Sequence, residues 1–175
     1  SVRGVPIHQL SVELEQGQRR LSVRVTEAAL AGGRLVGEYL IEHQAQPASL
    51  VEFDLTQADL AKLAASIPAW REKYIQGSLS AHASVLGDWA QPSTLRGDGW
   101  FHASGEHLGE VPLLRRFFKG MFGALADRLG LSVLESAEVT EASARWQLAQ
   151  ARIFTDDLRV KGMSGTEPIA IYVKG

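Results

Sequence analysis

Apolar and polar residues alternate along most of this chain, and a period of two residues is typical of strands that bury one face. The runs at 10–14 and 21–25, separated by the polar segment 15–18, predict a hairpin. The dipeptide Gly32-Gly33 predicts a second turn. Further strands are expected at 35–41, 50–55, 77–85, 95–103, 131–134, 142–148, 152–160 and 169–173, the last two separated by a turn at 162–165.

Two segments change to a helical period. The first, TQADLAKLAAS, begins at Thr56, where a Thr or Asp side chain can cap the helix, and its apolar residues fall on one face. The second runs over about 111–129, with Pro112 in its first turn and Gly130 suited to its C-terminal end.

These elements predict a mainly β protein with nine or ten strands and two helices. Short turns between successive strands favour antiparallel pairing, and the chain lacks the regular strand–helix alternation of a parallel sheet. We therefore expect residues 1–175 to form a single β-rich domain built on an antiparallel sheet.

A near-duplicate hexapeptide suggests an internal repeat. AQPASL begins at Ala45 and AQPSTL at Ala90, which is an offset of 45 residues. Each copy lies between two predicted strands that a helix follows. The pattern predicts repeat units over 33–76 and 77–130, with the two joints equivalent.

Composition narrows the class of protein. Hydrophobic residues make up 45% and charged residues 22%, as in a folded domain, and the net charge of −2 gives no indication of nucleic-acid binding. The absence of cysteine excludes disulfides and thiolate metal sites. The opening, SVRGVPIHQL, resembles neither an initiator methionine start nor a signal peptide, so we expect a piece of a longer protein.

Candidate chemistry is sparse. His102, Glu106 and His107 lack the spacing of helical zinc motifs and are interpreted as a polar loop. The acidic pair at 156–157 is expected at a turn or strand end. Gly97 and Gly99 lack the third glycine of a phosphate loop and are expected to relieve crowding on one face of a sheet. We expect no enzyme activity, no metal site and no cofactor.

The segment VPLLRRFFKGMFGALADRLG is strongly amphipathic, with apolar residues at helical spacing and basic residues opposite them. Two interpretations remain open: the apolar stripe packs against the sheet, or it contacts lipid at a membrane surface or at the mouth of an apolar groove. The stripe consists of Leu114, Phe117, Phe118, Met121, Phe122 and Leu125.

Several motifs occur together in the order known from one family. LRGDGWF at 95–101 is followed by VPLL at 111–114, ARWQL at 144–148, RIF at 152–154 and LRVKG at 158–162. Upstream, VEFDLTQADLAKLAAS precedes a strand that opens with Gly77. This order resembles the C-terminal region of AsmA-like proteins over residues 34–175. Trp100 and the two Gln-Pro joints have no counterpart in that pattern.

The resemblance implies a function. AsmA-like proteins, with TamB and YhdP as relatives, are anchored in the inner membrane of Gram-negative bacteria and extend a curved, trough-like sheet across the periplasm. The trough shields phospholipid acyl chains on their way to the outer membrane. The family has no catalytic residues. The resemblance implies an open trough here, with phospholipid, neighbouring segments of the same protein and the membrane surface as partners.

Two alternating strands would supply the inward-facing wall of such a trough. Small side chains at some of these positions would leave room for acyl chains. The positions are Leu79, Ala81, Ala83, Val85, Leu95, Gly97, Gly99, Phe101 and Ala103.

Other functions without catalysis remain open. The chain could be a protein-binding module with a closed core, or a structural spacer, in a cell-envelope assembly or secretion system. These alternatives differ from the trough in one feature. Their inward residues would be fully packed, whereas those of a trough would line an open surface.

Overall fold

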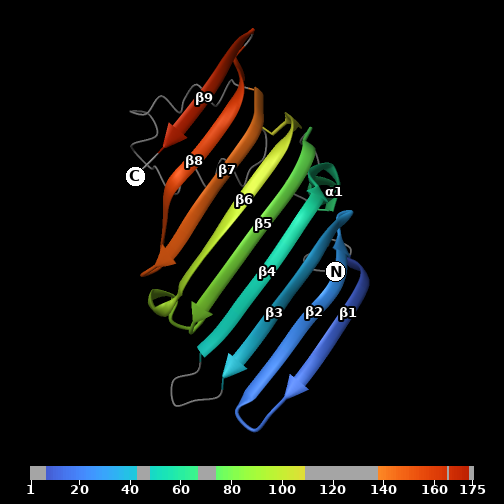
Figure 1. Cartoon of the computed structure of the whole chain (residues 1–175), viewed down its shortest axis with the longest axis vertical. Helices are drawn as coiled ribbons and strands as arrows, with labels where there is room; N and C mark the ends of the chain where they lie inside the picture. Colours follow the sequence, from blue (N-terminus) through green and yellow to red (C-terminus); the bar gives the residue numbers. More distant parts are fainter. Residues whose placement is uncertain (1–6, 43–47, 67–73, 109–137, 165, 174–175) are drawn as a thin grey trace.

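Nine strands form one open antiparallel sheet in the part of the chain that the computed structural model describes, residues 7–42, 48–66, 74–108, 138–164 and 166–173. Each strand pairs with its neighbour in the sequence, from β1 at one edge to β9 at the other (Figure 1). The strands are β1 (Ile7–Gln16), β2 (Arg20–Leu30), β3 (Gly33–Glu42), β4 (Ala48–Asp59), β5 (Gln76–Gly87), β6 (Arg96–His107), β7 (Glu138–Ala149), β8 (Arg152–Ser164) and β9 (Glu167–Val173).

The predicted fold class is confirmed: the described chain is mainly β, antiparallel and built on one curved sheet. One α-helix, α1 (Leu60–Ser66), follows β4, and a short 3₁₀ turn, η2 (Pro92–Thr94), precedes β6. The amphipathic helix expected at 111–129, the strand at 131–134 and the first Gln-Pro joint lie outside the described residues. The internal repeat therefore stays a prediction. The β3–β4 and β5–β6 connections do lie at the same end of the sheet, but alternate connections of any up-and-down sheet do so, with or without a repeat.

Two predicted boundaries are wrong. Residues 56–59 belong to β4, where a bulge at Thr56 and Gln57 lets the strand continue along β5, and the helix begins only at Leu60. The turn expected at 162–165 is also displaced. Gly162 pairs with β7 on one side and with β9 on the other, so β8 continues to Ser164.

Two connections are two-residue turns with positive φ at both positions. Ala31 and Gly32 have φ values of 51° and 80°, and Gln150 and Ala151 have 51° and 57°. Such turns match the right-handed twist of the strands that they join, which explains the tight β2–β3 and β7–β8 hairpins. The Gln-Ala turn has no glycine or asparagine to indicate it in the sequence.

The pairing register separates the side chains into two faces. Directly paired residues lie on the same side, so Val25, Gly37, Phe53, Ala83 and Gly99 form one row across β2 to β6. We call the face that carries this row the apolar face and the opposite one the polar face.

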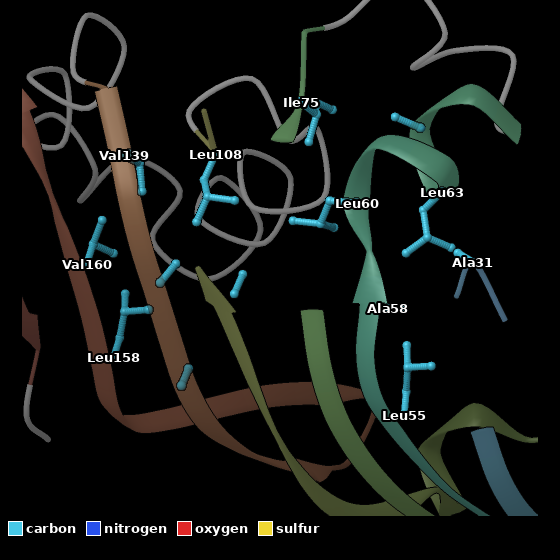
Figure 2. Close-up of a cluster of buried hydrophobic side chains, with 14 residues drawn as sticks. Ala31, Leu55, Ala58, Leu60, Leu63, Ile75, Leu108, Val139, Leu158 and Val160 are labelled. Atoms are coloured by element: carbon cyan, nitrogen blue, oxygen red, sulfur yellow. The ribbon is translucent and has the colours of Figure 1, made fainter. Parts of the chain in front are cut away.

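A packed core covers one end of the apolar face. Helix α1 contributes Leu60 and Leu63, the chain after β6 contributes Leu108, and β8 contributes Leu158 and Val160, all buried (Figure 2). Bulges in β2, β4 and β7 lie toward this end of the sheet. Because a bulge bends its strand and increases its twist, these irregularities help the sheet to curve over the core.

Asp59 fixes α1 to the sheet. Its Oδ1 accepts hydrogen bonds from the backbone N–H groups of Ala61, at 2.9 Å, and Lys62, at 3.2 Å. Its own backbone N–H donates to the carbonyl of Ala31 in the β2–β3 turn, at 3.0 Å. The sequence allowed either a Thr or an Asp side chain to cap this helix, and in the structure Asp59 is the cap.

Candidate functional site

The structure brings the nine predicted groove residues together on the apolar face. Strands β5 and β6 pair them directly, and the last of them lies just before β6. The pairs are Leu79–Ala103, Ala81–Phe101, Ala83–Gly99 and Val85–Gly97, and Leu95 is the unpaired member.

These residues divide between packed and accessible positions. Ala103 is part of the core cluster, and Leu79 and Phe101 pack against it. Ala83 and Leu95 are also buried but lie outside that cluster, and Leu95 lies at the other end of β6. Ala81, Val85 and Gly97 are only half-buried. Along the paired parts of the two strands, the apolar face thus runs from the packed core at Ala103 to the half-buried pair Val85–Gly97.

The position of Gly99 has no room for a side chain, because an aromatic ring lies over it. A Cβ at this position would collide with the Trp146 indole, which belongs to the residue paired with Gly99 on β7. The prediction that this glycine relieves crowding therefore has a specific cause. The space that Gly99 leaves is occupied by Trp146.

An apolar row crosses the accessible end of this face. It runs perpendicular to the strands from β1 to β8, one residue per strand, without a charged side chain. Its edge members, Leu14 and Ile153, are 67% and 47% exposed. We call it the open row: Leu14, Val23, Tyr39, Val51, Val85, Gly97, Leu148 and Ile153.

The open row is longer than an extended acyl chain of a membrane lipid. Eight strands spaced at about 4.8 Å give a length of about 34 Å, whereas the hydrocarbon of one membrane leaflet is about 15 Å deep. Sequence reasoning found two of its members, Val85 and Gly97. The others lie in separate strands, and only the pairing register aligns them.

The polar face carries charges that are largely paired. The Glu38 carboxylate accepts a hydrogen bond from Ser22 Oγ at 2.6 Å and lies near Arg24 and Arg20. The hydrogen bond from Ser22, assisted by the two arginines, lowers the pKa of Glu38. Such charged pairs make this face hydrophilic, in contrast to the apolar face on the other side of the sheet.

A second pair joins β7 to β8. Lys161 Nζ donates to Glu141 Oε2 at 2.9 Å, and this contact lowers the pKa of Glu141 and raises that of Lys161. Both side chains are substantially exposed, so the pair contributes little to stability.

The residues weighed as metal ligands do not converge. The polar loop expected for these residues is wrong, because β6 continues to His107. Glu106 and His102 are exposed on β6, and the ring of His107 lies 4.8 Å from that of Tyr74. The acidic pair at 156–157 lies within β8 and not at a turn or strand end as expected, and Asp157 accepts a hydrogen bond from Arg159 at 2.9 Å.

One cluster on the polar face was not anticipated. His82 Nδ1 lies 2.9 Å from Asp54 Oδ1, and a Glu52 oxygen is within 4.8 Å of both atoms. Sequence spacing gave no signal for it, because the three residues come from two strands. The hydrogen-bonded His82–Asp54 pair accounts for its geometry as a cross-strand contact.

Neither a membrane-spanning helix nor a relative was found. Within the described residues, no helix has the length and apolar character needed to cross a bilayer. No family model, no curated protein and no solved structure matches this chain.

Proposed function

We propose that this protein is a lipid-shielding segment of an AsmA-like protein in the periplasm of a Gram-negative bacterium. Its apolar face would hold the acyl chains of a phospholipid during transport between the inner and outer membranes, as part of outer-membrane biogenesis. The parent protein would be anchored in the inner membrane. The observation that carries the proposal is the open row, an accessible apolar stripe across eight strands.

Physical chemistry supports an apolar ligand at this stripe. Apolar surface removed from water contributes about 25 cal/mol per Å², and Leu14, Tyr39 and Ile153 all retain exposed area. A contiguous exposed apolar surface on a protein commonly marks an interaction site. An acyl chain lying along the row would cover these side chains and lose its own contact with water.

Shielding needs a surface rather than a reaction. The proposal therefore involves no catalytic residue, cofactor or metal. The membrane-surface contact expected of the helix at 111–129 belongs to the same proposal, but that segment lies outside the described residues.

Replacing Val85, a half-buried member of the open row, by Glu tests the proposal. The chain would be incubated with vesicles of phosphatidylethanolamine and phosphatidylglycerol, recovered, and examined for bound phospholipid by native mass spectrometry. Ser84→Glu is the matched control, because Ser84 is the neighbouring residue on the polar face.

We expect wild type and Ser84→Glu to carry phospholipid and Val85→Glu to lose it, with circular dichroism showing that all three are folded. A wild-type chain that carries no lipid, or equal binding by both variants, would refute the proposal.

A protein-binding or spacer module of an envelope assembly or secretion system is the alternative. The exposed edge strand β1 favours it, since nine of its ten residues are exposed and one side of its backbone is unpaired within the described sheet. In the shielding proposal, the same edge would pair with a neighbouring segment of the parent protein. Folded protein that binds no phospholipid in the experiment above would favour the alternative.

A further inference from the structure

The polar face contains a depression of about 1050 Å³ near the start of β6. Ten of its fourteen lining residues lie on the polar face of β4 to β8. The other four, Gly97, Gly99, Trp146 and Leu148, belong to the apolar face, and Gly97 and Leu148 are also members of the open row. Its volume lies at the upper end of the usual range of small-molecule sites.

An exposed aromatic ring borders this depression. Trp100 is paired with His82 and Arg145 on the polar face, and it is 40% exposed. Leu86, also in the lining, is exposed as well. An indole in such a place offers a flat apolar surface to a ligand among polar neighbours.

Unpaired polar side chains surround the ring. Arg96, Asp98, Arg145 and Gln147 all line the depression, and within the described chain none of their side chains has a hydrogen bond or ion pair. By contrast, Glu38, Glu141 and Asp157 on the same face are each bonded to a partner. The depression thus combines an aromatic surface with planar groups that can donate and accept hydrogen bonds.

We propose that this depression binds a carbohydrate. The C–H face of a pyranose ring would stack on Trp100, and its hydroxyl groups would exchange hydrogen bonds with Arg96, Asp98, Arg145 and Gln147. Guanidinium, carboxylate and amide groups each present two adjacent hydrogen-bonding atoms, which suits the neighbouring hydroxyls of a sugar.

The charges of the site favour a sugar over the other polar ligands. Arg96 and Arg145 are positive, whereas Asp98 and Asp157 are negative, so the depression has no excess charge to attract a nucleic-acid backbone. A lone phosphate would bind the arginines but would leave the exposed indole uncovered. An oligosaccharide of a few residues suits both the volume and the mixed lining.

The test uses defined oligosaccharides and intrinsic tryptophan fluorescence. Chitohexaose, cellohexaose and maltohexaose would be titrated separately into the whole chain to about 10 mM, the range in which weak binding is measurable. Trp100→Ala removes the stacking surface. Trp89→Ala is the matched control, because Trp89 is 50% exposed in the β5–β6 connection and does not line the depression.

We expect at least one of the three sugars to bind, Trp100→Ala to weaken it by about tenfold or more, and Trp89→Ala to leave it unchanged. Asp98→Ala should also weaken it, and amide shifts in an NMR titration should map to β5, β6 and β7. No binding of any sugar, or equal losses in both tryptophan variants, would overturn the proposal. Val85 does not line the depression, so Val85→Glu should still bind the sugar when it has lost phospholipid, which distinguishes failure of one proposal from failure of the other.

Discussion

At the scale of single residues, a missing Cβ determines how β6 and β7 pack. Gly99 leaves room for Trp146, whose indole would otherwise collide with a side chain at residue 99. A Cβ at residue 99 would also collide with the backbone carbonyl oxygen of His82 on β5. Interiors are close-packed, so an added methyl group here has no space to enter.

Gly99→Ala should therefore lower the free energy of unfolding by about 1–3 kcal/mol, the usual effect of overpacking. Urea unfolding followed by tryptophan fluorescence measures it. Gly17→Ala is the control, since a Cβ there meets only the Arg20 carbonyl at an ordinary 3.7 Å. A change at Gly99 no larger than that at Gly17 would show that Trp146 is free to move aside.

Asp59 connects the sheet to α1 through a single carboxylate. Asp59→Ala removes both hydrogen bonds to the first turn of the helix and should cost about 1 kcal/mol. Asp59→Asn keeps an oxygen in the same place and should retain most of that stability. Thermal unfolding of the two variants compares them directly, and equal losses would assign the effect to charge rather than to capping.

Glu38 should make stability depend on pH in the acidic range. Its pKa is lowered from about 4.5 in the folded chain, so its contribution is complete above that value and is lost as the pH falls through the folded-state pKa. Glu38→Gln should be less stable than wild type near neutral pH, and the difference should shrink as the pH falls below 4.5. A difference that stays constant with pH in thermal unfolding would contradict this assignment.

At the scale of elements, one hairpin carries strain that substitution can relieve. Gln150 and Ala151 both have positive φ and are exposed, and this conformation disfavours residues other than Gly, Asn and Asp. Replacing them together by Asn and Gly should raise the free energy of unfolding by about 1 kcal/mol. Ala170→Gly, an exposed strand position, should instead lower it in the same urea experiment.

The strands were largely predictable from the sequence, whereas the irregular elements between and within them were not. Alternation located every described strand and placed Val85 and Gly97 on the same face of the sheet. It missed the bulge at Gln57, because the polar residues of a bulge resemble those of a helix start, and it missed the Gln-Ala turn, which has no sequence signal.

The candidate site was only partly predictable for a related reason. Alternation gives the face of a residue within its own strand, whereas exposure depends on neighbouring strands and on the core. Ala103 and Val85 have the same pattern in sequence, yet Ala103 is buried beside the core and Val85 lies in the open row. The polar depression depends on the same cross-strand register, which places Trp100 beside Arg145.

At the scale of the whole molecule, the sheet does not close on itself. Strand β1 is exposed along nine of its ten residues, and its apolar side chains extend the apolar face to the edge. Few of the features that protect natural edges are present, since β1 has no proline or lysine and a single irregular stretch between His8 and Val12.

An edge of this kind should pair with another strand, and in the isolated chain a second copy is the available partner. We expect association to increase with concentration in sedimentation velocity. Leu14→Lys should weaken it, because a charge would then replace an apolar side chain that pairing covers. Glu15→Lys changes the charge on the polar side of the same strand and should have a smaller effect. A monomer at every concentration, or equal effects of both lysines, would mean that the apolar side of β1 does not drive pairing.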